Sequence, residues 1–174
     1  MDFACYVLRA FQNFRNEEPQ LSNKLRVPTP LLYLLTADVW GLVGTNLKTM
    51  NLQFSRKELA AIISVADAMI KADGKIDEME QLTFAFEMTR LGVREDNWAG
   101  ILADVQQIAP AETFSIISNF GNEKKKYVAA FLITLMAIDG NIADAEMKLW
   151  KMVSIVCKLP TMDVNEAAVI MNKL

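Results

Sequence analysis

The sequence predicts an all-α fold, and three observations lead to that expectation. Apolar residues make up 52% of the 174 residues, and charged residues make up 22%. Glycine (7) and proline (5) are scarce, whereas alanine, leucine and methionine, which lose little side-chain freedom in a helix, are plentiful. Apolar residues also recur at helical spacing between short polar segments. We therefore expect a compact antiparallel helical bundle with one sizeable core.

Residues 1–54 are expected to form an N-terminal helical extension that packs on the bundle or is linked to it. Within residues 2–15, phenylalanines and other apolar residues follow the spacing of an amphipathic helix. Residues 15–30 contain three prolines and predict a loop, and residues 31–52 predict a second, mostly apolar helix. The aromatic stripe with its arginines leaves open a contact with a membrane surface.

Residues 55–174 are expected to form the bundle itself, because capping signals mark the starts of its helices. Three N-cap residues are followed by glutamate three positions later, which is the pattern of a capping box: Ser55 with Glu58, Asp77 with Glu80, and Asp163 with Glu166. Glycines mark several helix ends. The helices are expected at about 55–72, 77–91, 95–106, 111–119, 122–138, 143–158 and 163–174.

The sequence contains no histidine, and this excludes several kinds of site. It removes the Ser-His and Cys-His pairs of nucleophilic enzymes and the commonest ligand of transition metals. The two cysteines, Cys5 and Cys157, cannot supply a four-ligand zinc site by themselves. We expect both to be buried, reduced thiols of a cytoplasmic protein.

The charge and the hydropathy pattern limit the partners. The net charge is −3 and no basic stripe follows the chain, so we expect no nucleic-acid partner. The longest apolar run, residues 30–44, is too short to span a bilayer, and the N-terminal residues lack the pattern of a signal peptide. We therefore expect a soluble protein with no transmembrane segment.

An acidic turn occurs twice, 66 positions apart, in KADGKIDEMEQL (71–82) and AIDGNIADAEMKLW (137–150). Both copies follow a long apolar helix and share an Asp-Gly-x-Ile-x-x-x-Glu pattern. A repeat of this kind predicts two related helical hairpins. The matched residues are Asp73 and Asp139, Gly74 and Gly140, Ile76 and Ile142, and Glu80 and Glu146.

The loops of calcium-binding EF-hands share part of this pattern, but the remainder does not fit. In the EF-hand frame, Met69 and Lys71 would stand at the first two ligand positions of the first copy, and Leu135 and Ala137 at those of the second. None of these side chains is a suitable calcium ligand. We therefore reject the EF-hand interpretation.

The two motifs, each closing an Ala- and Leu-rich helix, resemble the TerB-like family associated with tellurite resistance. The resemblance covers about residues 55–174 and implies a bundle of two related halves with acidic residues on one surface. It also implies a role in a bacterial stress-response system linked to divalent cations or membrane-associated assemblies. The second copy departs from the first, since Ala143 stands where the first has Asp77. The positions that match the motif are Asp73, Asp77, Glu80, Asp139, Asp144 and Glu146.

Two interpretations of these acidic residues remain open at this point. In the first they only cap helices, as Glu80 does in its capping box. In the second they bind a divalent cation, Ca²⁺ or Mg²⁺, because packing about a pseudo-dyad would gather mutually repelling carboxylates. Asp73 and Asp139 favour the second, since each ends a helix, where the dipole disfavours an anion by about 0.3–1 kcal/mol.

We expect a non-enzymatic module that binds a protein partner, with the divalent cation as its only expected cofactor. The alternative is a small hydrolase that uses the same carboxylates as acid and base. No nucleophile or phosphate loop accompanies them in the sequence. A homodimer also remains open.

Overall fold

The structure is a computed structural model, and it describes residues 52–75 and 77–173. The chain divides into two units, Met1–Thr49 and Met50–Leu174, of which the first lies outside the described residues. The helices expected in the N-terminal extension therefore lie outside them as well. The second unit contains the repeated turns and the bundle.

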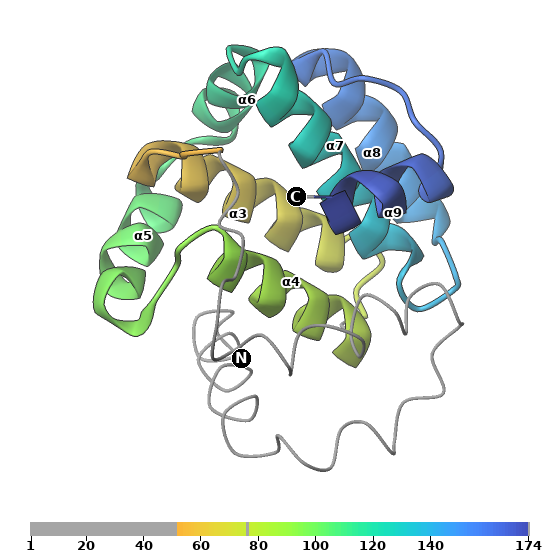
Figure 1. The fold of residues 1–174 in the computed structure, drawn as a ribbon, viewed down its shortest axis with the longest axis horizontal. Coiled ribbons are helices and arrows are strands. Elements are labelled where there is room, and N and C mark those ends of the chain that lie inside the picture. The colour runs from red at the N-terminus through yellow and green to blue at the C-terminus, as the bar shows by residue number, and fades with distance from the viewer. Residues whose placement is uncertain (1–51, 76, 174) are drawn as a thin grey trace. The chain divides into compact units, whose positions relative to one another are not determined.

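The described residues form an all-α bundle, as the composition and the capping signals predicted. Within them there are seven helices and no strand. Each helix begins and ends within two residues of its expected position. In Figure 1 they are α3 (Arg56–Ile70), α4 (Glu78–Arg90), α5 (Glu95–Gln107), α6 (Pro110–Ser118), α7 (Asn122–Ala137), α8 (Asp144–Cys157) and α9 (Val164–Lys173).

The capping residues of the sequence account for three of the helix starts. In each of them the glutamate three positions after the N-cap accepts that residue's backbone N–H. The N-cap side chain in turn accepts an N–H of the first turn. Such a cap stabilises a helix by about 1 kcal/mol. The three pairs are Ser55 with Glu58, Asp77 with Glu80, and Asp163 with Glu166.

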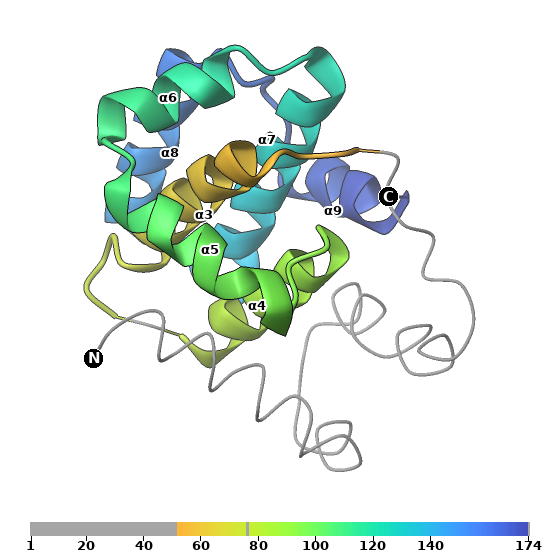
Figure 2. The ribbon, with the colours of Figure 1, turned by 90° about the vertical axis from the view of Figure 1, so that its left-hand side faces the viewer.

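Helices α3 and α7 form the centre of the bundle (Figure 1). Every residue of α7 from Tyr127 to Met136 is buried, so this part of the helix has no polar face. α3 packs against α5, α6 and α7, and Figure 2 shows α5 lying in front of it. The rings of Tyr127 and Phe131 are stacked, with their centroids 6.1 Å apart. Burying each such side chain contributes about 1.5–3 kcal/mol.

The two hairpins predicted from the repeat are α3–α4 and α7–α8. α3 begins at Arg56 and α7 at Asn122, while α4 begins at Glu78 and α8 at Asp144, so that both pairs of starts are 66 positions apart. The helix ends match as well. The N–H of Val93 is bonded to the carbonyl of Met88, and the corresponding N–H of Leu159 to that of Ser154. The repeat therefore extends from the sequence to the hydrogen bonds.

A buried polar network joins α4, α7 and the C-terminal helix α9. The carboxylate of Glu87, only 3% exposed, accepts hydrogen bonds from Arg90 (2.7 Å) and from the Tyr127 hydroxyl (3.0 Å). Arg90 also donates to the backbone carbonyl of Met171 on α9, at 3.1 Å. The guanidinium thus neutralises a buried charge and attaches α9 to the bundle.

No helix in the described part of the chain has the length and the apolar character that crossing a membrane requires. The longest, α7, has 16 residues and begins with three consecutive lysines after Glu123. Its apolar residues are buried by the surrounding helices of the bundle.

Candidate functional site

The two acidic turns have the same local geometry. Asp73 accepts the backbone N–H of Lys75 at 2.8 Å, and Asp139 accepts that of Asn141 at 2.8 Å. The glycine after each aspartate has a positive φ, 78° in the first turn and 80° in the second, a conformation that favours glycine. Both aspartates are exposed. These bonds are Asx turns, and they offset the unfavourable position of each anion at a helix end.

Glu80 and Glu146 lie just after the turns, in the first turn of α4 and of α8. Glu80 accepts the backbone N–H of Asp77 at 3.3 Å, and Glu146 accepts that of Ala143 at 2.8 Å. Ala143 has no side-chain acceptor, so the second copy retains only half of the capping box. Unlike the aspartates, the two glutamates are almost fully buried, with exposed fractions of 6% and 4%.

The two buried glutamates meet each other. Their side chains are hydrogen bonded, and two carboxyl groups can form such a bond only if one of them carries a proton. Burial raises the pKa of Glu80, the bond to Glu146 raises it further, and the N–H of Asp77 partly opposes this. With the charges of Glu146 and Asp139 also acting on it, the pKa of Glu80 reaches about 8. The pair therefore retains one proton at neutral pH.

The structure brings together some of the six acidic residues that the sequence singled out, but not all. Glu80 and Glu146 are in contact, and the charge of Asp139 acts on Glu80. Asp77 contributes its backbone N–H and uses its side chain to cap α4, where it accepts the N–H of Met79 at 2.7 Å. Asp73 and Asp144 are exposed, with Asp73 bonded within its own turn.

The donor atoms fit a hard cation in their chemistry, because carboxylate oxygens are the ligands that Ca²⁺ and Mg²⁺ prefer. Their arrangement, however, does not supply enough ligands for such a cation. Within residues 52–75 and 77–173, no group of three or more cysteine, aspartate or glutamate side chains is placed to hold a metal ion. A cation at the Glu80–Glu146 pair would therefore have to draw in carboxylates that now lie apart.

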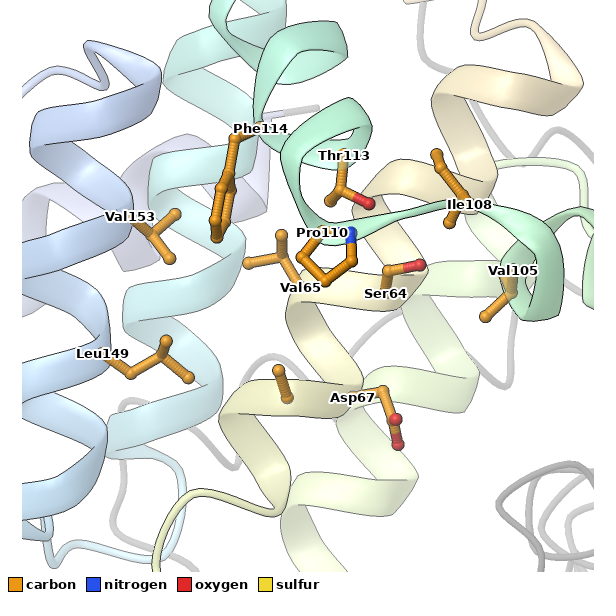
Figure 3. A pocket seen from close by; sticks show the side chains of 11 residues that line it. Ser64, Val65, Asp67, Val105, Ile108, Pro110, Thr113, Phe114, Leu149 and Val153 are labelled. Carbon is orange, nitrogen blue, oxygen red and sulfur yellow. The ribbon is translucent and has the colours of Figure 1, made fainter.

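Two cavities along the described residues lie elsewhere. A groove of about 240 Å³ runs between α3, α6 and α8 (Figure 3). Phe114, Leu149 and Val153 form its apolar side, and Asp67, paired with Lys71 at 2.7 Å, lies at its polar side. A smaller hollow of about 180 Å³ lies beside the Lys57–Glu112 ion pair. Neither is lined by Glu80 or Glu146.

The groove was not foreseen from the sequence. Its lining comes from four helices and the loop before α6, and no local pattern relates these residues before the chain folds. The apolar spacing that predicts each helix also assigns Leu149 and Val153 to the core side of α8. A groove left between core-facing side chains depends on how the helices pack, which periodicity does not determine.

Comparisons with known proteins place the chain in a family. No protein-family model and no curated protein matches it. Among solved structures, it is similar to PG1108, a protein of unknown function from Porphyromonas gingivalis W83. The two are 40% identical, the match covers 71% of this chain and 99% of PG1108, and the TM-score is 0.63. This chain belongs to the PG1108 family.

Membership of the PG1108 family supports the all-α fold directly, because the match extends over almost the whole of PG1108. It assigns no activity, since PG1108 is itself described as a protein of unknown function. The chemistry of this PG1108-family chain therefore depends on its own residues. Its most distinctive polar feature is the buried carboxyl pair.

Proposed function

We propose that this protein is a non-enzymatic, TerB-like module of a bacterial stress-response system, which binds a protein partner through its acidic turns. A divalent cation, Ca²⁺ or Mg²⁺, takes part at the Glu80–Glu146 pair. The observation that carries the proposal is that these two carboxyl groups are buried and in contact with each other. The resemblance of the two turns to the TerB-like motif supports the assignment of the module.

Capping alone does not account for two buried carboxyl groups in contact. Each glutamate needs one oxygen to accept the N–H of its N-cap residue. Burying the rest of both groups is unfavourable, because each loses its hydration. A cation that replaces the shared proton would relieve the repulsion between the ionised groups, and the exposed Asp73 and Asp139 lie on the turns just before them.

The module is not proposed to capture tellurite itself. Tellurite is an oxyanion, and the acidic turns would repel it. The thiol of Cys157 is buried and its pKa is raised to about 11 by burial, so it is poorly suited to bind or reduce an oxyanion. The proposed role is therefore that of a scaffold, in which the acidic turns and the cation recognise a partner protein.

Calorimetric titration with CaCl₂ and MgCl₂ at pH 7 tests the cation. Because Glu80 holds a proton at this pH, binding should release protons, and the measured heat should depend on the ionisation enthalpy of the buffer. Replacing Glu80 and Glu146 together by glutamine should abolish the signal. The matched control is Glu166→Gln, which alters an exposed capping-box glutamate on α9. An absence of heat and of any rise in Tm at millimolar metal would refute the proposal that a divalent cation binds.

The alternative function, a small hydrolase, has one observation in its favour. A protonated carboxyl beside a second carboxyl group is the arrangement that acid–base hydrolases use. Against it, both groups are at least nine-tenths buried, and the two cavities described above do not reach them. Turnover of ester or glycoside substrates that Glu80→Gln abolishes would favour this alternative over the scaffold.

A further inference from the structure

The outward side of α8 carries three exposed apolar side chains on consecutive turns. Met152 is 45% exposed, Ile155 is 77% exposed and Val156 is 46% exposed. Single exposed apolar residues are ordinary on protein surfaces. Three of them at positions i, i+3 and i+4 of one helix form a continuous patch, and such patches commonly mark interaction sites.

Three exposed lysines border this patch, at positions 148, 151 and 158. Together with Met152, Ile155 and Val156 they make up what we call the α8 outer face. At 100° per residue, Lys151 and Lys158 follow one edge of the helix, while Met152 and Val156 follow the other. Ile155 lies between the two edges, and Lys148 lies almost in line with it, two turns earlier along the helix.

The lysines of this face have no carboxylate within ion-pair distance among the residues that the structure describes. Elsewhere in the unit, Lys75, Arg94 and Lys125 likewise have no such partner among those residues. Six other basic residues are paired with aspartate or glutamate: Arg56, Lys57, Lys71, Arg90, Lys124 and Lys126.

The sequence around the face is basic, although residues 55–174 as a whole are acidic. Those residues contain 17 acidic and 13 basic side chains, a balance of −4. Residues 147–162 contain Lys148, Lys151 and Lys158 and no aspartate or glutamate. The only acidic residue on this side of α8 is Asp144, in the first turn, where the helix dipole favours an anion. Among the described residues, no acidic side chain of α8 accompanies the lysines in the C-terminal two-thirds of the face.

The opposite side of α8 holds the helix firmly in the bundle. Val153 is 1% exposed, Cys157 is fully buried, and the Cys157 thiol contacts the backbone carbonyl of Phe114 on α6 at 3.8 Å. A partner therefore meets side chains on a helix that is already fixed in place. Binding to such a preformed surface loses less conformational entropy than binding to a segment that must first fold.

We propose that the α8 outer face docks an acidic amphipathic helix of a partner protein. Apolar residues of that helix, at i, i+3 or i+4, and i+7, pack over Met152, Ile155 and Val156. Aspartates and glutamates beside them pair with the three lysines, whose aliphatic stems extend the apolar contact. The α8 outer face and the acidic turns have no residue in common. The proposal therefore does not depend on whether a cation binds at the acidic turns.

An anionic membrane is the competing occupant, and the structure favours it less. Helices that lie in a membrane interface insert large side chains such as tryptophan, phenylalanine and leucine, whereas the exposed apolar residues here are methionine, isoleucine and valine. The acidic excess of residues 55–174, with exposed Asp139 and Asp144 near the start of α8, would also be repelled by anionic lipid. A single helix can avoid those charges by following the lysines.

Selection from a phage-displayed library of 16-residue peptides on the full chain tests the proposal. The enriched peptides should be acidic, with apolar residues at helical spacing. For a synthetic copy of such a peptide, Ile155→Asp should weaken binding by about tenfold or more, since it places a charge at the centre of the contact. Lys151→Glu should weaken it by about threefold or more and reduce its sensitivity to salt.

The matched control is Val169→Asp on α9. It also replaces an exposed apolar side chain by aspartate, but Val169, which is 48% exposed, lies outside the α8 outer face. It should leave binding unchanged. Circular dichroism verifies that the variants fold. The proposal is overturned if no peptide is enriched, if the enriched peptides are not acidic, or if they bind Ile155→Asp as well as the original chain. Binding to phosphatidylserine-containing vesicles that Ile155→Asp abolishes, without acidic peptides, would assign the face to a membrane instead.

Discussion

Glu80 and Glu146 are hydrogen bonded to each other through their carboxyl groups, although each caps a different helical hairpin. They occupy the same position in two copies of one motif, 66 residues apart. The bond therefore lies where the two halves of the bundle meet. Because one proton is needed to form it, the contact between the halves depends on pH.

The first prediction is that the protein loses stability as the pH rises from about 4.5 to about 8. The pKa of Glu80 is raised from 4.5 in the unfolded chain to about 8 in the folded one. Below 4.5 the group is protonated in both states and its contribution to stability is complete. Between the two values the unfolded state releases the proton first, and stability falls by up to about 1.4 kcal/mol per pH unit. Urea unfolding at a series of pH values measures this slope.

Glu80→Gln provides the control for that slope. The amide of glutamine donates a hydrogen bond to Glu146 as the protonated acid does, but it cannot ionise. The variant should match the original protein near pH 5 and be the more stable of the two near pH 9. Burial also raises the pKa of Glu87, so a decline of the same sign should remain in the variant. Equal slopes in both proteins would contradict the shared proton.

A second prediction concerns Arg90, which neutralises the buried carboxylate of Glu87 and reaches the carbonyl of Met171. Arg90→Ala leaves a charge in the core without its partner, and we expect a loss of about 3–5 kcal/mol in the free energy of unfolding. The comparison is Arg56→Ala, which removes an exposed ion pair with Asp104 and should cost about 1 kcal/mol or less. Similar losses in the two variants would show that the Glu87 network contributes little.

The helices and the capping boxes were predictable from the sequence, because both depend on residues within one turn of each other. The hairpin repeat was predictable because it preserves the spacing of Asp-Gly and Glu. The Glu87 network was not, since a glutamate in a helix reads as exposed, and its partner Tyr127 is 40 positions away. The lack of ion pairs at the α8 lysines among the described residues could not be predicted either, because the position of a lysine in the sequence does not show which carboxylates the fold brings near it.

Lys158 was also missed, and it supports a third prediction. It ends α8 with a φ of 53°, at the position that corresponds to Gly92 after α4, where φ is 83°. A left-handed conformation is strained for lysine and natural for glycine. Lys158→Gly should therefore raise the stability by about 0.5–1 kcal/mol, and Gly92→Ala should lower it by about 1 kcal/mol. Thermal melting of the two variants measures both, and a loss of stability in Lys158→Gly would show that its side chain stabilises the helix end.

The last prediction separates capping from charge at the acidic turns. Asparagine at positions 73 and 139 would retain the Asx hydrogen bonds to Lys75 and Asn141 while removing two anions from helix C-termini. Without added metal, Asp73→Asn with Asp139→Asn should therefore be as stable as the original protein or more stable, by about 0.3–1 kcal/mol for each site. If the aspartates serve only as caps and no cation binds at the Glu80–Glu146 pair, millimolar Ca²⁺ should leave the Tm of both proteins unchanged. If they supply ligands, Ca²⁺ should raise the Tm of the original protein alone, and the order of stability should reverse as the metal is added. A double variant that responds to Ca²⁺ as the original protein does would remove both aspartates from the proposed cation site.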